Sequence, residues 1–128
     1  DLADVAPLNT VAIEVAGVSF VGLSPGLDDA LFDHDGQLTK REVRAVTLSS
    51  LAPIGGELLW DIGAGSGSIG IEWLLADPAN RAIGIEPRED RLANARANAR
   101  ALRTLLGVTG SDFDRRYPID VEELPIFG

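Results

Sequence analysis

The sequence contains no cysteine and a single histidine, His34. Without cysteine the chain forms neither a disulfide nor a thiolate metal site, and one histidine excludes a histidine-rich metal site. We therefore predict no metal site. Long apolar runs are missing too, since no stretch approaches the roughly 20 residues that a membrane-spanning helix needs. We expect a protein that does not interact with membranes.

Positive charge is also scarce. The 128 residues carry 20 acidic and 11 basic side chains, for a net charge of −9. This balance disfavours nucleic acid as a partner, because phosphate contacts need a basic surface. It also disfavours substrates rich in carboxylates, unless basic side chains gather locally, as in the cluster Lys40, Arg41 and Arg44. No secretory or transit pattern is present, and the chain begins at Asp1. We therefore expect a fragment of a cytoplasmic protein. The sequence leaves open whether the protein forms a homo-oligomer.

Local patterns divide the chain into three regions. Apolar residues alternate over 11–15, which is typical of a strand. We assign residues 1–22 to the end of a preceding domain. Turn residues and an irregular acidic stretch predict a linker over 23–38. Residues 39–128 then form the main domain, whose tail from 111 shows no clear apolar strand.

The main domain is predicted to open with a helix. Thr39, followed three residues later by Glu42, matches a capping box, so the helix should begin near Lys40. Its apolar face is predicted to contain Val43, Val46 and Leu51. Thr39 has two competing roles, as a helix cap or as a ligand contact.

Strands and helices alternate after this first helix. An apolar strand over 58–62, predicted to be buried on both faces, precedes a helix over 69–75. A second strand covers 81–86, and a second helix follows Pro87 with a buried leucine and alanine stripe. This order predicts an α/β fold with a parallel sheet that is incomplete at its C-terminal end.

A glycine-rich turn joins the first of these strands to its helix. It reads Asp61-Ile62-Gly63-Ala64-Gly65-Ser66-Gly67, and glycines let a backbone turn sharply and approach a ligand closely. The following helix adds free N–H groups and the positive end of its dipole. Asp61 either holds a ligand ammonium group or bonds nearby turn amides. Glu86, at the end of the next strand, either accepts both ribose hydroxyls or serves as a helix-start acid.

The spacing of the glycines separates two ligand classes. A dinucleotide fingerprint, G-x-G-x-x-G, requires glycine at position 68, where Ser68 stands. Gly63, Gly65 and Gly67 give instead the D-x-G-x-G-x-G form usual for methyltransferases. We favour S-adenosylmethionine as the ligand of a class I, Rossmann-like methyltransferase. A dinucleotide-dependent oxidoreductase is the alternative if Ser68 replaces the third glycine.

Two sequence blocks, His34–Ala45 and Glu57–Ser68, resemble the carbon-15 methyltransferase domain of the decarboxylating precorrin-6Y C5,15-methyltransferases. Stand-alone cobalt-precorrin carbon-15 methyltransferases are similar over this region. Residues 7–15 resemble the end of a tetrapyrrole methylase domain, which implies the fused enzyme and assigns 1–22 to that domain. The resemblance implies S-adenosylmethionine-dependent methylation of carbon 15 of a precorrin, with decarboxylation of its acetate, in cobalamin biosynthesis.

The resemblance also bears on individual residues. Together with the motif it gives a cofactor-binding set of Thr39, Asp61, Gly63, Ala64, Gly65, Ser66, Gly67 and Glu86. It assigns no catalytic residue. The family continues with an adenine-side segment that this chain replaces by its unassigned tail, so a truncated, non-catalytic binding fragment is a second alternative.

Overall fold

Residues 24–105 and 119–120 are described by a computed structural model of the chain, with side chains described up to residue 102. The regions predicted for 1–22, including the strand over 11–15, lie outside the described residues. So does the tail from 106, apart from the two residues of a short strand.

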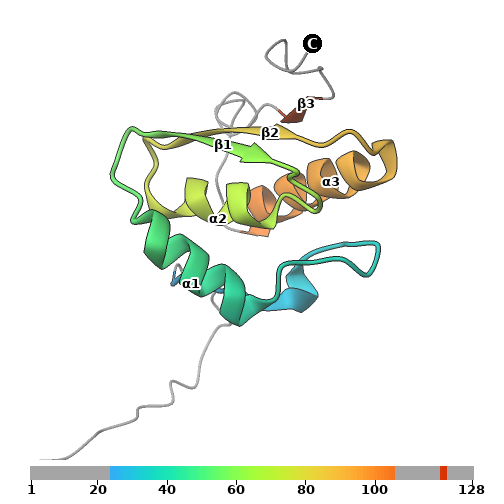
Figure 1. Cartoon of the computed structure of the whole chain (residues 1–128), viewed down its shortest axis with the longest axis horizontal. Helices are drawn as coiled ribbons and strands as arrows, with labels where there is room; N and C mark the ends of the chain where they lie inside the picture. Colours follow the sequence, from blue (N-terminus) through green and yellow to red (C-terminus); the bar gives the residue numbers. More distant parts are fainter. Residues whose placement is uncertain (1–23, 106–118, 121–128) are drawn as a thin grey trace, which may run out of the picture.

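Helices and strands alternate through the described part of the chain (Figure 1). In chain order they are the 3-10 helix η2 (Asp29–Leu31), α1 (Arg41–Leu51), β1 (Leu58–Ile62), α2 (Ser68–Ala76), β2 (Arg81–Ile85), α3 (Glu89–Leu105) and β3 (Ile119–Asp120). The predicted order of strand, helix, strand, helix from residue 58 onward is confirmed. Pro78 follows the end of α2 closely and Pro87 precedes α3, as expected from the restrictions that proline places on the helical backbone.

The described strands form a parallel sheet in the order β1-β2-β3. β1 pairs with β2 from Leu58↔Arg81 to Ile62↔Ile85, and β2 pairs with β3 at Ile85↔Asp120. β3 lies in the tail, which we left unassigned because it shows no clear apolar strand. A two-residue strand joins a sheet through backbone hydrogen bonds and leaves too short an apolar pattern to detect.

The core lies between the sheet and the helices. α2 and α3 lie on one side of the sheet, and α1 packs against α2 (Figure 1). The buried core consists of Leu27, Phe32, Leu48, Ile71, Trp73, Leu74, Ala82, Ala99 and Leu102. The predicted stripe of α3 is confirmed as far as its side chains are described, because Leu92, Ala95, Ala99 and Leu102 are all buried.

Two features of α1 differ from the prediction. The N-cap is Lys40, without a side-chain cap hydrogen bond, so the capping box at Thr39 was wrong. The predicted apolar face is exposed, with 58% of Val43 and 66% of Val46 accessible. Arg44 and Leu48 are buried instead. The helix turns this side toward α2 because Arg44 has buried polar partners there, which outweigh the apolar pattern of α1 itself.

β1 also differs from the prediction that both its faces are buried. Leu59 packs against the core, whereas Leu58, Trp60 and Ile62 are exposed on the other face. Within residues 24–105 and 119–120, helices cover one face of the sheet. A continuous apolar run is therefore only half covered by this part of the fold, although parallel strands are normally buried on both faces.

Candidate functional site

A cavity of 430 Å³ lies between the glycine-rich turn and the irregular segment that precedes α1. Its volume is within the range of about 300–1,000 Å³ typical of small-molecule sites. The lining residues are Gly36, Gln37, Leu38, Thr39, Asp61, Gly63, Ala64, Gly65, Ser66, Ser68, Ile69 and Arg91. Six of the eight predicted cofactor-binding residues are among them, and Gly67 and Glu86 are not. The fold thus brings Thr39 to the turn after β1.

The glycine-rich turn has a backbone that favours glycine. Gly63, Gly65 and Gly67 have φ angles of 78°, 56° and 76°, in the left-handed region that side chains disfavour. The amides of Gly63 and Ala64 donate to the Ile85 carbonyl, at 2.8 and 3.0 Å, which fastens the turn to the end of β2. A Cβ at Gly63 would meet no atom within 4 Å. At Gly63 and Gly65, backbone conformation rather than crowding inside the protein therefore requires glycine.

Asp61 lies at the end of β1 and has a structural contact as well as a place in the cavity. Its Oδ2 accepts from the amide of Gly70, at 3.1 Å, in the first turn of α2. That bond satisfies one of the amides that a helix leaves unpaired at its start. Of the two roles considered for Asp61, bonding to a nearby amide is present, and the carboxylate also lines the cavity.

Glu86 holds the glycine-rich turn in place through a hydrogen bond to its backbone. Its side chain is 3% exposed, Oε2 accepts from the amide of Gly65 at 2.9 Å, and Oε1 accepts from the amide of Arg88 at 3.0 Å. One carboxylate thus holds both the glycine-rich turn and the start of the connection to α3. Of the two roles considered for Glu86, bonding to an amide next to the start of α3 is present, and the contact with a ribose stays a prediction.

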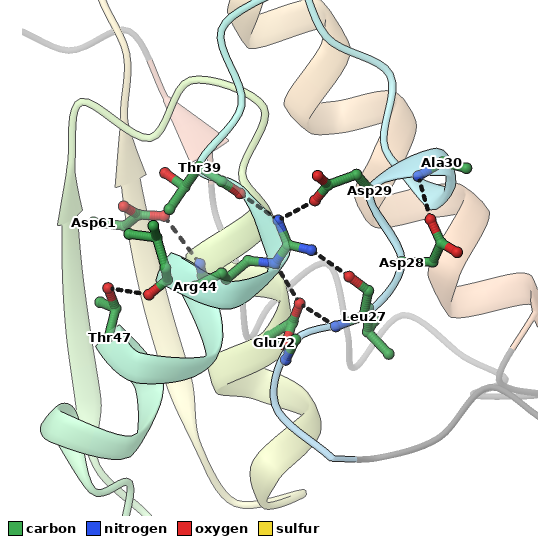
Figure 2. Close-up of polar contacts among 12 residues, drawn as sticks. Leu27, Asp28, Asp29, Ala30, Thr39, Arg44, Thr47, Asp61 and Glu72 are labelled. Carbon is green, nitrogen blue, oxygen red and sulfur yellow. Dashed lines mark hydrogen bonds and ion pairs between the residues drawn. The ribbon is translucent and has the colours of Figure 1, made fainter.

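Arg44 anchors the segment before α1, and its role was not predicted. Its Nε donates to Glu72 at 2.5 Å, and its terminal nitrogens donate to Asp29 at 3.2 Å and to the carbonyls of Thr39 and Leu27 (Figure 2). The guanidinium also lies over the ring of Phe32. Arg44 is 0% exposed, so its assignment to a surface basic cluster with Lys40 and Arg41 was wrong. Glu72, an acid within an otherwise apolar helix, was the sequence signal for a buried partner.

Arg91 anchors the same segment at the rim of the cavity. Its Nε donates to Asp35 at 2.8 Å and its Nη2 donates to Gln37 at 2.6 Å. The Arg88 guanidinium lies 3.5 Å from Asp35. The hydrogen bond from Arg91 is the main reason that the pKa of Asp35 is lowered. Sequence reasoning missed Arg91, since the α3 face that points toward residue 35 is set by the fold.

The part of the chain that the structure describes contains neither a membrane-spanning helix nor a metal-binding cluster. None of its helices combines the length and the apolar character that crossing a membrane requires. Among the same residues, no three His, Asp and Glu side chains gather as a metal ion would need.

The family model and two relatives of this chain all carry the name of a precorrin methyltransferase. Residues 30–115 match the precorrin methyltransferase domain family. The chain is 62% identical over 109 residues to the precorrin-6Y C(5,15)-methyltransferase [decarboxylating] of a Sinorhizobium species, covering 83% of this chain and 25% of that protein. It is 39% identical over 107 residues to the enzyme of the same name from Mycobacterium tuberculosis H37Rv, covering 84% of this chain and 27% of that protein.

Solved structures show the same relationship. The C-terminal domain of precorrin-6Y C5,15-methyltransferase from Rhodobacter capsulatus superposes with a TM-score of 0.66 at 44% identity, covering 81% of this chain and 50% of that one. The precorrin-6Y C5,15-methyltransferase from Geobacter metallireducens GS-15 gives 0.64 at 32% identity, covering 80% and 50%. The chain thus spans half of these solved chains and about a quarter of the curated relatives.

The fold and the comparisons agree on one interpretation. The parallel sheet with its glycine-rich turn is the incomplete Rossmann-like arrangement predicted for a class I methyltransferase. The family match favours this interpretation over a dinucleotide-dependent oxidoreductase. The chain belongs to the family of precorrin methyltransferase domains.

Proposed function

We propose that this chain provides the S-adenosylmethionine-binding part of an enzyme that methylates carbon 15 of a precorrin and decarboxylates its acetate, in cobalamin biosynthesis. The observation that carries the proposal is the cavity between Thr39 and the glycine-rich turn, at the end of β1. The names of the Sinorhizobium and Mycobacterium relatives support the substrate class and the decarboxylation.

The residues around the cavity suit an adenosyl ligand. The proposed binding set is Thr39, Asp61, Gly63, Ala64, Gly65, Ser66, Gly67 and Glu86. The bare backbone of Gly63 and Gly65 allows close approach, since nothing in the protein occupies the space where a Cβ would stand at Gly63. Asp61 supplies a carboxylate for the ligand ammonium, and Thr39 supplies a hydroxyl from the opposite wall.

Glu86 is proposed to accept a ribose hydroxyl as well as support the turn. A carboxylate oxygen has two lone pairs, and each Glu86 oxygen accepts one backbone amide as described above. Acceptor capacity is therefore left on both oxygens. Because Glu86 is 3% exposed, a ribose hydroxyl would have to approach it beside Gly65.

The contribution of these residues to the reaction is alignment. When bound, S-adenosylmethionine supplies a methyl group activated by its sulfonium. The turn and Thr39 hold the donor from two sides, which converts a collision into an oriented encounter with the ring carbon. Asp61 holds the ammonium group of the donor, which contributes to its orientation. We assign no general base to this chain.

The test is binding rather than turnover, because the chain spans half of its solved relatives. Calorimetric titration of the full chain with S-adenosylhomocysteine is expected to show one saturable site, and reduced nicotinamide dinucleotide is expected not to bind. Gly65→Val should abolish the site. Gly56→Val is the matched control, because Gly56 also has a positive φ, of 90°, but does not line the cavity. Binding of the dinucleotide instead of the adenosyl ligand would overturn the proposal.

We further propose the organisation of the longer protein. Residues 1–22 end a tetrapyrrole methylase domain, 23–38 link it to the methyltransferase domain, and 39–128 form part of that domain. Leu27 and Phe32 are buried in the core, so the link is held against the domain. We propose a cytoplasmic enzyme, in keeping with the biosynthetic relatives.

A further inference from the structure

Two segments that are distant in the sequence form the two walls of the cavity. One wall is the stretch 36–39, and the other runs from the end of β1 through the glycine-rich turn into the first residues of α2. Arg91 of α3 also lines the cavity. Neither the residues 33–39 nor the residues 63–67 belong to a helix or a strand. Backbone hydrogen bonds to Ile85 fasten the glycine-rich turn to β2. The separation between the turn and the segment 33–39 depends in addition on side chains that bridge them.

Asn98 of α3 bridges the start of the segment 33–39 and the glycine-rich turn from a buried position. Its side chain is 2% exposed and does not line the cavity. Oδ1 accepts from the amide of Asp33 at 2.7 Å, and Nδ2 donates to the carbonyl of Asp33 at 2.9 Å. Nδ2 also donates to the carbonyl of Ser66 at 2.9 Å. Both amide hydrogens of Asn98 are thus used, one toward the segment that leads into the first wall and one toward the second wall.

We propose that Asn98 is a positioning residue for the methyl-donor site, which ties the segment 33–39 to the glycine-rich turn and so sets the width of the cavity. This inference rests on the proposed function, since it concerns the same site. The carboxamide suits the task because it combines an acceptor and two donors in one rigid plane. Aspartate would keep the acceptor and lose both donors, and leucine would lose all three bonds.

Other anchors fix the segment at different points, which makes the role of Asn98 specific. Arg44 holds the carbonyl of Thr39 at the far end of the segment, and Arg91 holds Asp35 and Gln37 at the rim. These contacts fasten the segment to α1 and α3. Asn98 adds the bond to Ser66, which belongs to the opposite wall. Loss of Asn98 is therefore expected to loosen both walls together.

The experiment compares variants at position 98 with the same changes at Asn94. Asn98→Leu removes the three hydrogen bonds at similar volume, and Asn98→Gln keeps the polar groups but moves them by one methylene. Asn94 is the matched control, because it lies one turn earlier on α3, is half-buried and does not line the cavity. If Asn98→Leu does not fold, Asn98→Gln still tests whether Asn98 positions the two segments.

The first readout is hydrogen exchange of the ligand-free full chain. Asn98→Leu and Asn98→Gln are expected to speed exchange in both 33–39 and 63–67, while the Asn94 variants leave both segments unchanged. The second readout is affinity for S-adenosylhomocysteine, which is expected to fall about tenfold or more in folded Asn98 variants. A residue that only stabilises the core would lower the unfolding midpoint without changing this affinity.

The outcomes separate the inference from the proposed function. Parent-like exchange in either segment of a folded Asn98 variant would overturn the positioning role. So would parent-like affinity in a folded Asn98→Gln chain that binds the ligand. Failure of the parent chain to bind S-adenosylhomocysteine would overturn the proposed function, and the exchange comparison would still decide whether Asn98 joins the two walls.

Discussion

The buried ion pair between Arg44 and Glu72 leads to a quantitative prediction about stability. The side chains are 0% and 3% exposed, and Nε of Arg44 lies 2.5 Å from Oε1 of Glu72. Arg44→Met keeps an unbranched apolar chain, shorter than that of arginine, and removes the charge. It leaves the Glu72 carboxylate with the amides of Gly26 and Leu27, at 2.6 and 2.9 Å, but without its buried counter-ion.

The expected cost follows from this loss. Removing one partner of a buried pair costs about 3–5 kcal/mol, because the other charge stays desolvated and unpaired. The carbonyls of Leu27 and Thr39 lose a donor as well. Since domains are stable by only about 5–15 kcal/mol, this single change removes a large fraction of the total. Glu72→Leu should cost a similar amount, and the double variant should cost less than the sum by about 1–3 kcal/mol.

Urea unfolding followed by tryptophan fluorescence measures these differences. Trp73 is 4% exposed and packs in the core, so its emission reports unfolding. Arg41→Met is the matched control, because Arg41 is exposed on the same helix and its loss should change stability by less than about 0.5 kcal/mol. A cost below about 1 kcal/mol for Arg44→Met, or strict additivity in the double variant, would refute the reasoning.

Three further predictions concern the cavity and the side chains that hold the segments around it. Thr39→Ala should weaken binding of S-adenosylhomocysteine but change the free energy of unfolding by less than about 0.5 kcal/mol, because Lys40 rather than Thr39 is the N-cap. Thr39→Ser should bind like the parent. If calorimetry gives the alanine variant the same affinity as the parent, Thr39 does not belong to the site. Glu86→Ala should lower the free energy of unfolding and weaken binding of S-adenosylhomocysteine by about 1–3 kcal/mol, because the amide of Gly65 loses its acceptor. An unchanged dissociation constant in calorimetry would contradict this. Asp35→Asn should destabilise the chain at pH 7, and the difference from the parent should fade as the pH drops through the lowered pKa of Asp35, because the carboxylate contributes fully only above its ordinary value of 3.8. Unfolding midpoints that keep the same difference at pH 7 and in strong acid would show that the bond to Arg91 does not depend on the charge.

The sequence alone determined those features that depend on neighbouring residues. The strand over 58–62, the glycine-rich turn and the helix after it are local, and each is encoded by residues within one short window. The positive φ angles of Gly63, Gly65 and Gly67 agree with the reason for which glycine was expected there. Asp61 and Glu86 were predicted in the same way, from their places at the ends of strands. Both bond to backbone amides in or beside the glycine-rich turn.

Only the tertiary structure decided which distant groups meet. The apolar pattern of α1 predicted a buried face with Val43 and Val46, yet the face with Arg44 is buried, because Glu72 is 28 residues away in the sequence and adjacent in the fold. Asn98 meets Asp33 across 65 residues for the same reason. Local propensity and periodicity describe one element at a time, whereas a buried polar group is stable only when its partners arrive from other elements. The width of the cavity therefore depends on long-range hydrogen bonds that no single stretch of this sequence contains.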